Sequence, residues 1–182
     1  MPYSQPFLNQ KTEISVMTEY SISPRVMSSL GDRIITILEK MAFFIADEAL
    51  PGEKMECADD IARAIVSFKG PVRGKIQLCA SMNVCSALAA NILGLMENET
   101  VTHDRAADAF MEVVNVLAGN ILPELWGGTE IINITTPVFF PMTRTEWREI
   151  EQSPWCVRLN SVDGPILLFL DLGNGAEKEA SL

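Results

Sequence analysis

Four polar or small residues between positions 108 and 119 could act together on another molecule. Asp108, Glu112, Asn115 and Gly119 follow one another at intervals of four, three and four residues. Wound as an α-helix at 100° per residue, they occupy one stripe about 60° wide. The apolar residues of the same segment fall on the opposite side, where they would pack on a core: Phe110, Val114, Leu117 and Ile121. The stripe would then face outward, either as an ordinary solvated face or as a binding surface.

Two features distinguish this stripe from an ordinary solvated face. Asparagine and glycine cost about 0.5–1 kcal/mol each relative to alanine inside a helix, yet the stripe contains both. The stripe also lacks lysine and arginine, which usually make an exposed helix face soluble. A flat face that carries carboxylates, one amide and a glycine would let the backbone of another protein come close.

A second segment, 70–75, contains the glycines and the lysine of a phosphate-binding loop. Such a loop needs four residues between its glycines and a serine or threonine after its lysine. Here three residues separate Gly70 from Gly74, and Ile76 follows Lys75. We therefore expect the turn of a β-hairpin rather than a P-loop.

Cysteine, histidine and zinc chemistry are weaker candidates. Cys57 and Arg63 have the spacing of a cysteine-phosphatase loop, but Asp59 and Asp60 lie between them and would repel phosphate. The single histidine, His103, has no G-x-S-x-G nucleophile elbow to serve. Zinc is not expected, because the chain has one histidine and no two cysteines at ligand spacing.

Composition favours a single-domain protein of the cytoplasm. The 182 residues are 48% hydrophobic, which suits one sizeable core. The net charge of −10 disfavours nucleic acid and anionic membrane surfaces as partners. No apolar run approaches the roughly 18 residues of a membrane helix, and residues 1–10 lack the features of a secretory signal. The four cysteines form no C-x-x-C pair, so we interpret them as reduced thiols.

Hydrophobic periodicity and turn residues predict an α+β fold. We expect a domain over residues 21–172, between an N-terminal tail, 1–20, and a C-terminal tail, 173–182. Helical periodicity runs over three segments: 24–44, 82–95 and 102–125. Strand and turn patterns occupy 61–68, 72–80, 129–135, 138–140, 155–162 and 166–172, and the polar residues 143–153 could hold a helical turn. This order favours a two-layer sandwich, in which an antiparallel sheet built from hairpins carries long helices on one face.

Several segments, taken in order, resemble the CheX/CheC/FliY family of chemotaxis phosphatases. The segment 108–120 matches the family motif of Asp or Ser, Glu four residues on and Asn three residues later, followed by Gly-Asn. Four further segments are similar to parts of CheX-like domains: 39–44, 68–75, 89–95 and Thr136-Pro137. The resemblance covers most of residues 25–172 and implies a CheC-like fold.

The resemblance also implies an activity. Proteins of this family dephosphorylate a phosphorylated CheY-type response regulator, whose aspartyl phosphate is held with Mg²⁺ in the partner's own active site. Glu112 would contact the partner's lysine, and Asn115 would enter the partner's site and orient the attacking water. Asp108 would be supporting, and Gly119 would permit close approach. The phosphatase would then need no cofactor of its own, and would act in chemotaxis or another two-component pathway.

The chain departs from the family pattern at two places. CheC-type members carry a second motif on an equivalent helix, but here Glu39 is followed by Ala42 where the asparagine would fall. A single site is therefore expected, as in CheX-type members. Pro137 also stands about one residue closer to Asn115 than in the family pattern, so the resemblance does not fix the strand register after the helix.

Two other functions fit the same residues. A non-catalytic adaptor could bind a receiver or signalling protein through the same face without hydrolysis. A sensing or structural α+β domain would have a stripe that only faces solvent. The resemblance further implies a homodimer formed through sheet edges, which the residues alone neither require nor exclude.

Overall fold

The computed structural model describes residues 24–96, 99–125 and 131–172. Within these ranges the chain forms an α+β domain, as predicted. The helices are α2 (Pro24–Ala42), α3 (Met82–Leu93), α4 (His103–Leu125) and α5 (Arg144–Glu151). The strands are β1 (Asp47–Glu48), β2 (Ile61–Lys69), β3 (Arg73–Ser81), β4 (Asn133–Ile134), β5 (Val138–Met142), β6 (Cys156–Ser161) and β7 (Gly164–Leu172). The predicted tails, 1–20 and 173–182, lie outside the described residues.

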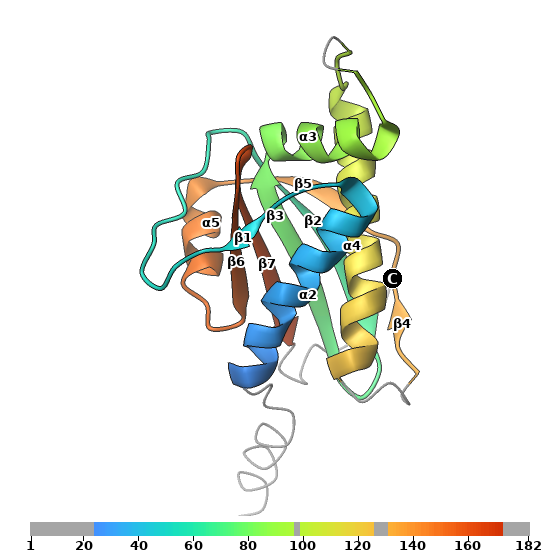
Figure 1. Ribbon diagram of the computed structural model, residues 1–182. Helices are drawn as coiled ribbons and strands as arrows, with labels where there is room; N and C mark the ends of the chain where they lie inside the picture. The colour runs from blue at the N-terminus through green and yellow to red at the C-terminus, as the bar shows by residue number, and fades with distance from the viewer. Residues whose placement is uncertain (1–23, 97–98, 126–130, 173–182) are drawn as a thin grey trace, which may run out of the picture.

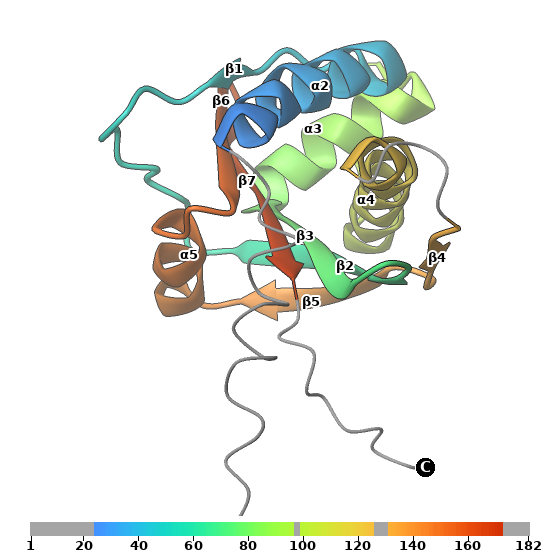
Figure 2. The ribbon, with the colours of Figure 1, turned by 90° about the horizontal axis from the view of Figure 1, so that it is seen from below.

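The strands form one antiparallel sheet in the order β1-β6-β7-β3-β2-β4, and β5 also pairs with β2. β5 takes the first part of the outer edge of β2, from Ile61 to Ile65, and β4 takes the last two residues. The two predicted hairpins, β2–β3 and β6–β7, are both present. The sheet is strongly curved, and its concave side holds the three long helices (Figure 2).

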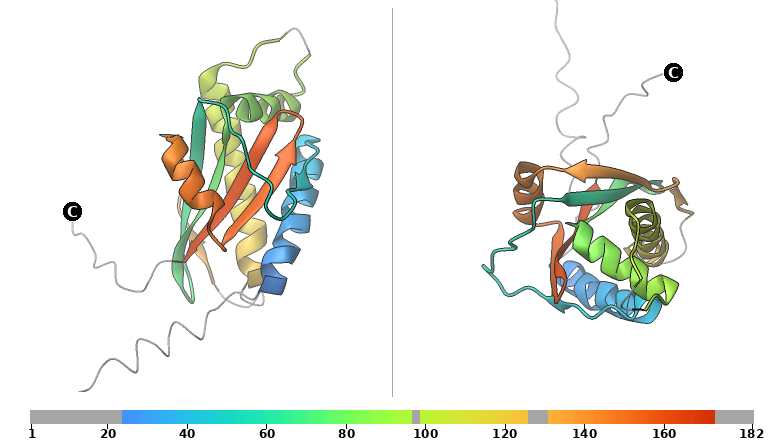
Figure 3. Two further views of the ribbon diagram at one scale, coloured as in Figure 1. Left: turned by 90° about the vertical axis from the view of Figure 1, so that its left-hand side faces the viewer. Right: turned by 90° about the horizontal axis from the view of Figure 1, so that it is seen from above.

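Alternation along the strands divides the core between the two faces of the sheet. Ala64, Val66 and Phe68 of β2 point to the helix side and join the main core with α2, α3 and α4. Ile61 of the same strand points to the other side, where a smaller core gathers around Trp147 of α5. The long helices therefore share one face, as predicted, and the short α5 covers part of the opposite face (Figure 3).

Helix α5 begins with a complete capping box. The Thr143 hydroxyl accepts a hydrogen bond from the Glu146 backbone N–H at 3.2 Å, and the Glu146 carboxylate accepts one from the Thr143 N–H at 2.8 Å. Trp147, 2% exposed, anchors the helix because its indole N–H donates to the Met55 carbonyl at 3.1 Å. A whole helix thus stands where the sequence indicated only a turn.

The capping box makes the start of α5 sensitive to acid. Hydrogen bonds from the backbone and hydroxyl of Thr143, with a smaller contribution from Arg63, lower the pKa of Glu146. Because this pKa is lower in the folded chain, the stabilisation is present above the ordinary carboxyl range and is lost as pH falls through the lowered value. We expect the amide chemical shifts of α5 to report this loss in the native protein below about pH 4.5. In Glu146→Gln the same amides should show no such titration.

Three departures from the predicted elements have physical causes. β1 was not predicted, because two exposed acidic residues have no strand pattern and depend on pairing with Asn160 and Leu159. The strand expected over 129–135 is only the two residues of β4, and 126–130 lie outside the described residues. β5 runs through Pro141 to Met142, which an edge strand tolerates.

Candidate functional site on helix α4

Helix α4 is held on one side by the main core. It begins at His103, one residue after the predicted start, and the Thr102 carbonyl accepts from the Ala106 N–H at 3.0 Å. Its buried residues form one continuous face: Ala106, Ala107, Ala109, Phe110, Val113, Val114, Leu117, Ala118, Ile121 and Leu122. The predicted division of this helix into an apolar and a polar side is therefore confirmed.

The four residues of the predicted stripe lie together on the opposite side of α4. Asp108, Glu112 and Gly119 are exposed, and Asn115 is half-buried between the exposed and buried sides. Partial burial limits the directions that the Asn115 amide can take, whereas Glu112 reaches freely into solvent. The structure thus brings together the residues that the helical spacing selected, while their chemical roles stay a prediction.

Gly119 leaves open space at the C-terminal end of the stripe. A Cβ atom built at this position meets nothing within 4 Å, so no neighbour inside the chain requires a glycine here. Pro123 stands four residues on, inside the same helix. Because proline has no N–H, the Gly119 carbonyl loses the donor that an α-helix normally supplies. The helix therefore offers a small residue and a carbonyl acceptor on the same exposed face.

Because the space around Gly119 is open, a substitution there can distinguish an effect on stability from an effect on binding. We expect Gly119→Ala to raise the free energy of unfolding by about 0.5–1 kcal/mol, because alanine is the better helix former. The measurement is urea unfolding followed by circular dichroism. If the glycine serves close approach by another protein, the more stable variant should nevertheless bind that protein less well. A loss of stability would mean that the helix is distorted at this position.

Contacts at both ends fix α4 in the fold. Arg33 of α2 and Glu124 near the end of α4 form an ion pair. On the sheet side, the ring of Phe139 packs edge-to-face against Phe110 with 6.3 Å between centroids, and against His103 with 6.0 Å. A face presented by such a rigid element can place side chains accurately in a partner's site.

The equivalent positions on α2 cannot form a second motif of the same kind. Glu39 is exposed, but Ala42 is fully buried, so the place of an asparagine faces the core. This geometry agrees with the single site expected from the sequence.

The structure also argues against a P-loop at residues 70–75 and a cysteine-phosphatase loop at Cys57. The segment 70–75 belongs to the β2–β3 hairpin, where the Gly70 N–H donates to the Val72 carbonyl at 2.9 Å. Burial raises the pKa of Cys57 to about 11, which keeps it a thiol instead of the thiolate that a cysteine phosphatase needs. Burial likewise raises the pKa of Cys85 and Cys156 to about 12. Among the described residues, no three His, Cys, Asp or Glu side chains gather where they could hold a metal ion.

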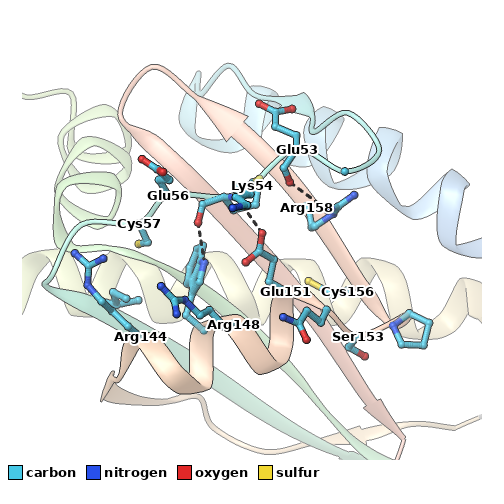
Figure 4. A pocket seen from close by; sticks show the side chains of 16 residues that line it. Glu53, Lys54, Glu56, Cys57, Arg144, Arg148, Glu151, Ser153, Cys156 and Arg158 are labelled. Atoms are coloured by element: carbon cyan, nitrogen blue, oxygen red, sulfur yellow. Dashed lines mark hydrogen bonds between the residues drawn. The ribbon is translucent and has the colours of Figure 1, made fainter.

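A cavity of about 1020 Å³ lies away from α4, between the loop 52–57 and α5 (Figure 4). Its polar groups largely serve the fold. Glu151 accepts from the Met55 N–H at 2.9 Å, and Arg158 donates to the Glu53 carbonyl at 3.4 Å. This cavity could not be predicted from the sequence, because its walls come from segments far apart in the chain. None of the four stripe residues lines it.

No helix of the described residues combines the length and the apolar character that crossing a membrane requires.

The sequence model of the CheX family, described as chemotaxis phosphatase CheX, matches residues 62–158. The match spans more than half of the chain and includes the whole of α4, so the protein belongs to the CheX family. No protein of curated function matches the chain in sequence.

Solved structures show the same CheC-like fold. The chemotaxis protein CheX of Desulfovibrio desulfuricans is 16% identical and superposes with a TM-score of 0.61, covering 82% of this chain and 99% of its own. CheX of Vibrio vulnificus is also 16% identical and superposes with a TM-score of 0.61, covering 84% of this chain and 100% of its own. The matching chain in a CheX–CheY–BeF3–Mg²⁺ complex from Borrelia burgdorferi is 18% identical and superposes with a TM-score of 0.54. The match covers 81% of this chain and 95% of that chain.

Proposed function

We propose that this protein is a phosphatase of a phosphorylated CheY-type receiver and acts through Glu112 and Asn115. The observation that carries the proposal is the exposed Glu-x-x-Asn face of α4, in a chain that belongs to the CheX family. The CheX–CheY–BeF3–Mg²⁺ complex from Borrelia burgdorferi supports a CheY-like partner. Because its fold is shared at low identity, the activity itself is carried over as a proposal.

The proposed reaction is hydrolysis of an acyl phosphate. A water oxygen attacks the phosphorus, the bond between phosphorus and the aspartate oxygen breaks, and inorganic phosphate and the free carboxylate are the products. The receiver supplies the Mg²⁺, which neutralises charge on the phosphoryl oxygens. The amide of Asn115 acts by orienting the water for in-line attack and transfers no proton, so its contribution is one of positioning.

Glu112 and the other stripe residues bring the two proteins into register. The Glu112 carboxylate, exposed on α4, pairs with the lysine of the receiver site and so fixes where Asn115 enters. Asp108 lies one turn earlier on the same face and supports this contact. Gly119 lets the receiver backbone approach α4, because no side chain projects there.

We propose the pathway, the cellular location and the oligomeric state of the protein from the same family resemblance. The family connects it with chemotaxis, and a related two-component output would use the same face. We further propose a cytoplasmic protein that forms a homodimer through sheet edges. Light scattering on the purified protein would give the oligomeric state directly.

The proposal is tested by following the phosphate on a CheY-type receiver from the same genome. Faster loss of phosphate in the presence of this protein supports the phosphatase. If the protein binds the receiver while the lifetime of the phosphate stays unchanged, it is an adaptor on the same fold. If it binds no receiver, the stripe only faces solvent.

A further inference from the structure

Helix α2 ends in a backbone conformation that a phenylalanine rarely takes. Phe43 has a φ of 47°, and it is the only non-glycine residue with positive φ in the described ranges. Its N–H donates to the Glu39 carbonyl at 3.0 Å, which closes the helix in the left-handed manner that usually employs glycine. A side chain at such a position strains the backbone.

The neighbouring helix makes the same kind of ending with the expected residue. α3 is followed by Gly94 with a φ of 61°, and the Leu95 N–H donates to the Ala90 carbonyl at 2.9 Å. Both helices therefore end in a left-handed residue, which is glycine after α3 and phenylalanine after α2. The difference needs a reason beyond the backbone.

The ring of Phe43 contributes little to folding. Phe43 is 80% exposed, whereas the next residue, Phe44, is 2% exposed and belongs to the main core. The strained backbone therefore destabilises the chain, and the largely exposed ring offsets little of that cost through burial. Strain kept at an exposed position commonly marks a contact with another molecule.

Exposed apolar side chains also stand at the end of α3. Leu93, 48% exposed, is the last residue of α3, and Met96, 73% exposed, follows shortly after it. The C-terminal ends of α2 and α3 lie side by side, next to the first half of α4 (Figures 1 and 3). That half of α4 carries Asp108 and Glu112 of the stripe.

The charge of the stripe supports the need for an apolar contact. Asp108 and Glu112 are both acidic, and the chain has a net charge of −10. Such a face gains little long-range attraction toward a site that bears a phosphoryl group. Affinity must then come from short-range contacts, in which a projecting aromatic ring is especially effective.

We infer that Phe43, together with Leu93 and Met96 at the neighbouring end of α3, is an apolar anchor that seats the phosphorylated receiver against the face of α4. This inference rests on the proposed function and names a surface that determines affinity outside the Glu112–Asn115 pair. The receiver should present a shallow apolar depression beside its phosphorylation site to accept the ring.

Binding is measured with a CheY-type receiver saturated with beryllofluoride and Mg²⁺, titrated calorimetrically with the full chain. Phe43→Ser should weaken binding about tenfold or more and raise KM for the phosphorylated receiver with kcat unchanged. Val162→Ser is the matched control, because Val162 is an apolar residue that is 100% exposed in the β6–β7 turn, outside the proposed anchor. Equal binding by Phe43→Ser and Val162→Ser overturns the inference and leaves the proposed function intact.

Two further readouts separate the anchor from the chemistry. Phe43→Gly should raise the unfolding midpoint by about 2–4 °C, because it removes the strain, and a lower midpoint would show that the ring serves the fold. If Phe43→Ser weakens binding but the native protein does not shorten the phosphate lifetime, the anchor stands and the phosphatase proposal fails. If the native protein binds no receiver, both fail together.

Discussion

Asn115→Ala should abolish the acceleration of receiver dephosphorylation, by about 100-fold or more, while the protein remains folded. The amide is proposed to hold the attacking water in line with the phosphoryl group, and alanine offers no group that could replace it. Asn115 is half-buried on α4, so the substitution leaves the core unchanged. Alanine is also the better helix former. The free energy of unfolding should therefore be equal to that of the native protein or slightly higher.

Asn120→Ala is the matched control for this variant. Asn120 is exposed on the same helix, and its side-chain amide donates to the Val116 carbonyl of its own helix at 2.8 Å. Consecutive residues stand about 100° apart around a helix, so Asn120 lies outside the stripe although it follows Gly119, and its loss should leave dephosphorylation unchanged. The assay follows the phosphate on the receiver with each variant. Retained activity in Asn115→Ala, or an equal loss in Asn120→Ala, would contradict the assigned role.

Phe110→Ala should give the largest loss of stability among the residues that position α4. Phe110 is fully buried, and its ring meets Phe139 edge-to-face. Truncating a buried phenylalanine typically lowers the free energy of unfolding by about 3–5 kcal/mol, through lost burial and the cavity left behind. Urea unfolding of the two proteins side by side gives this difference.

Phe140→Ala controls for the loss of a phenylalanine as such. Phe140 is 47% exposed on β5, next in sequence to Phe139 but on the other face of the sheet. Its truncation should cost well under 2 kcal/mol because solvent already reaches the ring. Equal losses in the two variants would mean that α4 does not pack on Phe110 as described.

The helical face of α4 could be predicted because its pattern is local. The spacing of Asp108, Glu112 and Asn115 fixes their common side as soon as the segment is a helix. The buried residues between them repeat at the matching interval, so sequence and structure agree on which side faces out. The two hairpins could also be predicted, because each pairs strands that are neighbours in the chain.

Features that depend on distant parts of the chain could not be predicted. β1 exists only through its partner β6, more than a hundred residues away in sequence. The placement of α5 opposite the long helices follows from Trp147, which packs with Met55, 92 residues earlier in the chain, in the smaller core on that face of the sheet. The sequence predicts that this helix continues to Phe44, whereas α2 ends at Ala42, because nothing in the apolar run through Phe43 indicates a left-handed residue without a glycine.

The lifetime of the phosphate on a CheY-type receiver from the same genome, with and without the native protein, tests the central claim most directly. The receiver is phosphorylated with a small phosphodonor in the presence of Mg²⁺, the donor is removed, and the remaining phosphoprotein is followed in time. The account predicts that catalytic amounts of the protein shorten the lifetime. The measurement is repeated with each receiver of that genome. If the protein binds a receiver and no phosphate lifetime changes, the result contradicts the account.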